Sequence, residues 1–160
     1  MGDAAIRFFS PNLITVCVDE MKDGDYSGEL WHQYATRPVT FRGAMELLFR
    51  MEDLFDEWNF PQRSTQCRSF KQLPEKQDRT PNFKRGKKMN LHNVQDKRGK
   101  QGTFIVQVQY RQNSSWQGQV IWAEENKREH FRSALELMKL MDSALSEEAA
   151  SATDTEAQAS

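Results

Sequence analysis

The chain has little cysteine: Cys17 and Cys67 are the two thiols in 160 residues. They have no short paired spacing, which argues against a disulfide framework and against a zinc site of the usual cysteine type. Both are expected to be ordinary surface residues, Cys17 on the outward face of a strand and Cys67 in an irregular segment. A reactive Cys67 is the alternative, because Arg63, Arg68 and Lys71 are near it in the sequence and cations lower a thiol pKa.

Long apolar runs are also missing, since no stretch approaches the roughly 20 residues that a membrane-spanning helix needs. The first residues, MGDAAIRFFSPN, lack the basic start and apolar middle of a signal peptide. We therefore expect a cytoplasmic protein with no membrane partner.

Catalytic motifs are absent as well. The chain has no phosphate loop, dinucleotide-binding glycine pattern, zinc-protease helix or nucleophile elbow. Its histidines, His32, His92 and His130, are far apart in the sequence. His32, at the end of a predicted strand, is expected to be a satisfied, half-buried histidine. The sequence thus predicts no catalytic residue, no cofactor, no metal site and a protein that is not an enzyme.

What the chain does contain is an internal duplication. Residues 14–55 align without a gap on residues 104–145, with Val16 on Val106 and Phe41 on Phe131. Each copy should be one supersecondary unit, and two such units should complete each other's core.

Each copy predicts two strands. Apolar and polar residues alternate over 104–110 and again over 116–122, which is typical of a hairpin with one buried face. In the expected register Tyr110 lies opposite Trp116, Val108 opposite Gly118, and the same pairing carries over to the first copy. Gly28 and Gly118 lie in mid-strand, where glycine weakens a strand unless space is needed, so a bulge or a close helix approach is predicted there.

A helical segment follows each hairpin, because apolar residues recur three and four positions apart. The helices are expected to begin near Gly43 and Ser133, or earlier at Phe41 and Phe131. The predicted fold is α+β, with two pseudo-symmetric ββα repeats that form one four-stranded antiparallel sheet with two helices packed on one face.

The predicted domain organisation is simple. One domain, residues 1–145, contains repeat 14–55 and repeat 104–145, joined by a basic mobile connector at 57–103. The tail 146–160 is small, polar and acidic, and is expected to be disordered.

The outward face of the predicted sheet is the first candidate interaction surface. With both helices on one side, the other side is expected to be open. Amides and apolar residues would lie there together: Trp31, Gln107, Gln109, Gln117, Gln119 and Ile121. Such a face is either solvated or in contact with a protein partner, with the connector folded back, or with single-stranded nucleic acid stacked on the indole.

The connector concentrates positive charge. Residues 61–100 hold 12 Lys and Arg against 3 Asp and Glu, a balance of +9, whereas the rest of the chain holds the remaining 10 and 20, a balance of −10. Candidate phosphate contacts are Lys84, Arg85, Lys87, Lys88, Lys97, Arg98 and Lys100. Because the acidic remainder would repel a polyanion, a protein partner of unknown identity is the main hypothesis and nucleic acid the alternative.

Two further cations, Arg42 and Arg132, occupy equivalent positions in the repeats, each four residues before a glutamate. The ordinary interpretation is an ion pair on a helix surface. The alternative is a pseudo-symmetric arginine pair at the sheet edge that holds an anion or an acidic partner. The sequence makes no prediction of the oligomeric state.

The stretches SSWQGQVIW and FRSALELMKLMDSAL resemble segments of small bacterial proteins to which no function is attached, and the resemblance implies no residue roles. The resulting hypothesis is a non-catalytic binding or regulatory module of bacterial type that acts through the open sheet face and the basic connector.

Overall fold

The computed structural model describes residues 5–63, 69–71, 80–83, 89–111 and 115–158, and only the helical backbone of residues 147–158. Six strands form one antiparallel sheet in the order β3-β2-β1-β4-β5-β6. The first copy supplies β1 (Ile14–Lys22), β2 (Asp25–Trp31) and β3 (Val39–Arg42), and the second supplies β4 (Gly102–Tyr110), β5 (Gln117–Trp122) and β6 (Lys127–Phe131). The copies therefore meet at the central β1–β4 pair.

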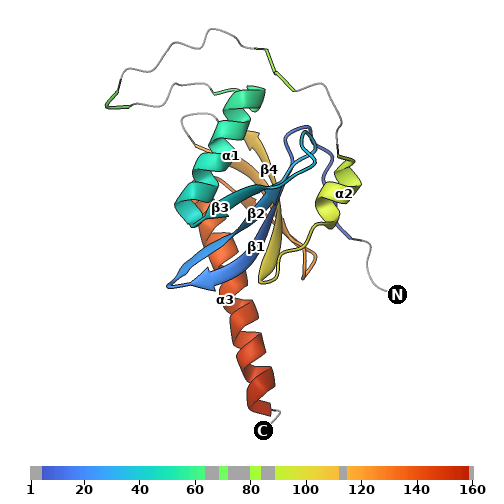
Figure 1. The fold of residues 1–160 in the computed structure, drawn as a ribbon, viewed down its shortest axis with the longest axis vertical. Helices are drawn as coiled ribbons and strands as arrows, with labels where there is room; N and C mark the ends of the chain where they lie inside the picture. The colour runs from blue at the N-terminus through green and yellow to red at the C-terminus, as the bar shows by residue number, and fades with distance from the viewer. Residues whose placement is uncertain (1–4, 64–68, 72–79, 84–88, 112–114, 159–160) are drawn as a thin grey trace.

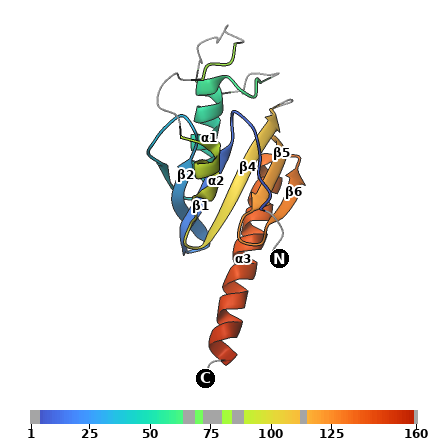
Figure 2. The same ribbon diagram turned by 90° about the vertical axis from the view of Figure 1, so that its right-hand side faces the viewer.

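In the described parts of the chain, three helices accompany the sheet. They are α1 (Ala44–Trp58), α2 (Leu91–Asp96) and α3 (Ala134–Gln158). α1 and α3 cover one face, and the short α2 lies at the opposite face (Figure 1). α3 continues well past the end of the sheet (Figure 2). It is helical through most of the segment 146–160, for which the sequence predicts a disordered tail.

The prediction of a four-stranded sheet with two helices is wrong. Each repeat is a βββα unit, because a third strand pairs with β2 or β5 before the helix begins. Phe41 and Phe131, considered as early helix starts, instead lie in these edge strands, opposite Gly28 and Gly118. The third helix, α2, lies within the connector.

The predicted hairpin register is confirmed as far as a β-bulge. Val108 faces Gly118 and Phe104 faces Trp122, but Tyr110 faces Gln117 instead of Trp116 because the register shifts between Val108 and Tyr110. The same shift occurs in the first copy, between Val18 and Glu20.

Glycine makes each bulge possible. A Cβ atom at Gly118 would run into the backbone carbonyl of Gln107, and one at Gly28 would run into that of Cys17. The predicted bulge at the two mid-strand glycines is thus confirmed.

The two copies share one core beneath α1 and α3. Trp116 of the second copy packs edge-on against Phe55 of α1, with ring centroids 5.4 Å apart. In the reverse direction, the hydroxyl of Tyr26 in the first copy donates to Sδ of Met138 in α3 at 3.5 Å. Each half thus places an aromatic side chain under the helix of the other.

Candidate binding surfaces

The chain itself covers the middle of the sheet face opposite α1 and α3. The N-terminal segment 6–13 and α2 pack there around a second apolar cluster, whose buried members are Phe8, Leu13, Val94, Ile105 and Ile121. The Phe8 backbone N–H donates to Oε1 of Gln95 at 2.8 Å, and Nε2 of Gln95 donates to the Phe8 carbonyl at 3.0 Å. The face predicted to be open is therefore partly closed, with α2 of the connector folded back onto it.

The N-terminal segment and α2 bury part of the predicted partner face and leave the rest accessible. Ile121 is buried beneath them, and Trp31 is half-buried with Nζ of Lys97 4.2 Å from its ring centroid. The amides remain accessible, with Gln107 and Gln119 half-buried and Gln109 and Gln117 exposed. We call these four residues the glutamine strip; Gln107 and Gln119 lie directly opposite each other on β4 and β5.

The described part of the basic connector is largely engaged within the chain. Lys97 lies over Trp31, and Nη1 of Arg98 donates to the carbonyls of Gln95 and Lys97 at 2.6 and 2.8 Å. The exposed Lys100 donates its backbone N–H to Oδ1 of Asp19 at 3.0 Å. The other four candidate phosphate contacts lie outside the described residues: Lys84, Arg85, Lys87 and Lys88.

Arg42 and Arg132 do not form a shared site. Arg42 ends the edge strand β3, and Arg132 follows β6 at the other edge of the sheet. Strands are spaced by about 4.8 Å, so these edges are about 24 Å apart, too far for one small anion. Nη2 of Arg132 lies 3.6 Å from Oε2 of Glu136, and the Arg132 side chain is 86% exposed, so this pair is of the weak surface kind.

A partly buried ion-pair network at the end of β4 is not evident from the sequence. Arg111, 3% exposed, donates to Oδ1 of Asp56 at 2.9 Å and pairs with Glu52, and Arg63 pairs with the same two carboxylates of α1. Nε of Arg111 also donates to the Pro61 carbonyl at 2.6 Å. The network anchors the first residues of the connector against β4 and balances two cations with two carboxylates.

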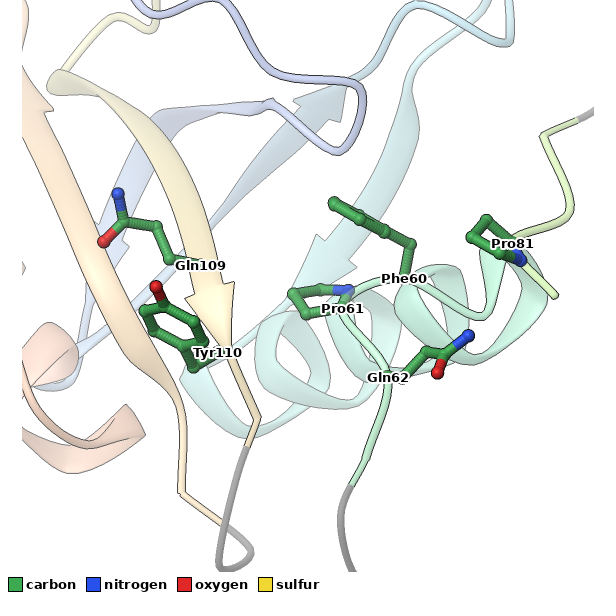
Figure 3. Close-up of a pocket in the computed structure, with 6 residues that line it drawn as sticks. All are labelled: Phe60, Pro61, Gln62, Pro81, Gln109 and Tyr110. Atoms are coloured by element: carbon green, nitrogen blue, oxygen red, sulfur yellow. The ribbon is translucent and has the colours of Figure 1, made fainter. Parts of the chain in front are cut away.

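A groove of about 270 Å³ lies beside this anchored segment (Figure 3). The described residues that line it are all uncharged: Phe60, Pro61, Gln62, Pro81, Gln109 and Tyr110. Gln109 and Tyr110 extend to the same side of β4 in Figure 3, although consecutive residues of a regular strand alternate. The bulge explains this, because an extra residue redirects side chains. Gln109 belongs to both the glutamine strip and the groove.

The remaining sequence candidates have structural roles. The Nδ1 of His32 accepts from the Tyr34 backbone N–H at 3.1 Å and its ring packs edge-on against Trp58, so the predicted hydrogen-bonded histidine is confirmed, although His32 is buried rather than half-buried. Cys17 is 2% exposed and not a surface residue, and burial raises its pKa to about 12. Cys67 lies outside the described residues.

No group of three or more potential metal ligands gathers anywhere in the described parts of the chain. None of the helices found there combines the length and the apolar character needed to cross a bilayer.

Comparison of the chain with known proteins found no matching family model, no matching curated protein and no matching solved structure. The surfaces described above are therefore interpreted from their geometry and chemistry alone.

Proposed function

We propose that this protein is a non-catalytic binding module that contacts a protein partner through the glutamine strip and the groove at its end. The observation that carries this proposal is the glutamine strip. Its four amide side chains lie on two neighbouring strands, all at least partly accessible, and none makes a hydrogen bond with another described residue. An amide offers both donors and an acceptor, which matches the alternating N–H and C=O groups of a polypeptide backbone.

A protein is better supported as the partner than nucleic acid. Trp31, the ring that the sequence suggests for base stacking on this face, is half-buried under Lys97. The guanidinium of Arg98 is already hydrogen-bonded to carbonyls of its own chain. A cytoplasmic location, expected from the sequence, is part of the same proposal.

The test uses a photo-crosslinking amino acid at position 117 of the full chain, expressed in its source cells, followed by identification and purification of the cross-linked protein. Calorimetry then compares the wild type, the strip variant Gln109→Arg with Gln117→Arg, and the control Gln101→Arg, which alters an exposed glutamine outside the strip. We expect the strip variant to weaken binding by about tenfold or more and the control to retain it.

Equal binding by the strip variant would contradict the proposal. So would salt-sensitive binding of random single-stranded or duplex oligonucleotides that weakens steeply between about 50 and about 200 mM salt.

A further inference from the structure

We infer that the groove at the end of the glutamine strip receives a proline-containing segment of the partner in the polyproline II conformation. This inference rests on the proposed function, because Gln109 lines the groove and belongs to the strip. It adds the chemical class of the partner segment.

The two repeats differ in the hydrogen bonds made at their bulges. The bulge in the second copy is left with more unbonded polar groups than the bulge in the first. In the first copy, the Gln101 N–H donates to the Val18 carbonyl at 2.8 Å and the Lys100 N–H donates to Asp19 at 3.0 Å. The residue 90 positions before Gln101 is Pro11, which has no N–H to donate.

In the second copy, the Asn12 side chain replaces the backbone donor that Pro11 lacks. Its Nδ2 donates to the Val108 carbonyl at 2.7 Å. The residue equivalent to Asp19 is Gln109. The side chains of Gln109 and Tyr110 make no hydrogen bond to any residue placed by the structure, so the second bulge keeps its polar groups available for a ligand.

Ring surfaces dominate the lining of the groove. Phe60 and Tyr110 supply two aromatic rings, Pro61 and Pro81 supply two proline rings, and the Tyr110 side chain is 54% exposed. Phe60 is supported from behind by Phe83, with ring centroids 5.7 Å apart. Grooves lined by aromatic rings are the usual recognition surface for proline-rich segments.

The polar groups of the groove suit the same ligand. Gln62 and Gln109 offer amide donors, and Tyr110 offers a hydroxyl. A polyproline II segment makes no internal hydrogen bonds, so its carbonyls are free to accept from such donors. Because the segment is already extended, it also loses little conformational entropy on binding.

The charges around the groove argue against a phosphate-bearing ligand. None of the described residues that line the groove is charged, and Arg63 and Arg111 beside it are paired with Glu52 and Asp56. A phosphate-bearing ligand would therefore find no unpaired cation among the lining residues. A volume of about 270 Å³ is near the lower bound of the roughly 300–1,000 Å³ of small-molecule sites, a size that suits one or two rings of an extended chain.

The experiment titrates the full chain with an oligoproline peptide, a glycine-serine peptide of equal length and oligo(dT), and follows binding by calorimetry. Tyr110→Ala removes the exposed ring of the groove, and Phe9→Ala is the matched control, because Phe9 is 85% exposed and lies outside the groove. Gln62→Glu is a second variant that adds a charge to the groove while circular dichroism monitors folding.

We expect saturable binding of oligoproline alone, weakened by about tenfold or more in Tyr110→Ala, weakened in Gln62→Glu and unchanged in Phe9→Ala. Absence of oligoproline binding, or equal binding by Tyr110→Ala, overturns the inference, as does Tyr110-dependent binding of oligo(dT). If the cross-linked partner still depends on Gln117 while oligoproline does not bind, the inference fails and the proposed function stands.

Discussion

At the scale of single residues, the environment decides what an arginine contributes. Arg111 is 3% exposed and donates to Pro61 and Phe55 carbonyls as well as to Asp56. A buried guanidinium is costly unless paired and hydrogen-bonded, so the connector and α1 must both be in place around it. Arg132, which the repeat pattern singles out, is instead 86% exposed.

Replacement of these arginines should therefore have unequal effects. Arg111→Ala leaves two carboxylates and two carbonyls short of a donor and should lower the free energy of unfolding by about 3 kcal/mol. Arg132→Ala should change it by less than about 0.5 kcal/mol. Urea unfolding at pH 7 measures both, and a loss for Arg111→Ala as small as that for Arg132→Ala would show that the network does not support the fold.

Tyr26 makes the stability sensitive to alkaline pH. Its burial, and to a smaller degree the charges of Asp142 and Asp25, raise the pKa of Tyr26 from 10.0 to about 12. The folded chain thus holds the phenol proton more tightly than the unfolded chain. This contribution is fully present below pH 10 and is lost as the pH rises toward 12.

We expect the free energy of unfolding to fall between pH 10 and 12, and to fall less steeply in Tyr26→Phe. Burial also raises the pKa of Tyr34 to about 12, so part of the decline should persist in the variant. Urea titrations at several pH values provide the comparison. Identical slopes for the two proteins would mean that Tyr26 titrates normally in the folded state.

At the scale of elements, the paired bulges depend on glycine. A side chain at Gly118 or Gly28 would have to displace the backbone of the neighbouring strand. Gly118→Ala and Gly28→Ala should each lower the free energy of unfolding by about 1–3 kcal/mol. Gln117→Ala, at the exposed neighbouring position, serves as the control. Denaturant unfolding should separate the two glycine variants from the control. A Gly118→Ala variant as stable as the wild type would indicate that the bulge tolerates a Cβ atom.

The periodicity of apolar residues in the sequence predicted the four longer strands and two of the helices. Apolar and polar residues alternate in the sequences of these strands, and α1 and the start of α3 carry apolar stripes, so the type and much of the register of β1, β2, β4 and β5 were predictable. The first five residues of β1 and of β4 are nevertheless all buried, because the second apolar cluster covers the other face. β3 and β6 have only four and five residues, and in β6 Phe131 alone is buried. An edge strand needs little burial, so its pattern is too short and too polar to distinguish from a loop.

The candidate site was less predictable because it depends on contacts between distant segments. The cover on the sheet relies on Phe8 and Gln95, 87 positions apart, and no local pattern connects them. The glutamine strip was predicted from alternation, but the groove requires the bulge to turn Gln109 and Tyr110 to one side. The mid-strand Gly118 was the signal that pointed to this bulge.

At the scale of the whole molecule, the shared core makes the two copies depend on each other for folding. β1 and β4 pair along the boundary between the copies, and Trp116 and Tyr26 each pack beneath the helix of the opposite half. Neither half has a core that is closed without the other. The molecule should therefore fold as one cooperative unit, although it contains two similar supersecondary units.

Division of the chain tests this cooperativity. Fragments 1–86 and 87–160 each contain one repeat, and each would expose one central strand and its half of the core. We expect neither fragment to show a cooperative thermal transition alone, and an equimolar mixture to recover one transition by circular dichroism and to elute as a complex.

Trp116→Ala in the second fragment should weaken this association more than Trp122→Ala, because Trp116 contacts α1 of the other fragment whereas Trp122 lies near Lys127 of its own. Cooperative unfolding of either fragment alone would mean that a single repeat is an independent folding unit, and that the pairing of β1 with β4 joins two domains that are already folded.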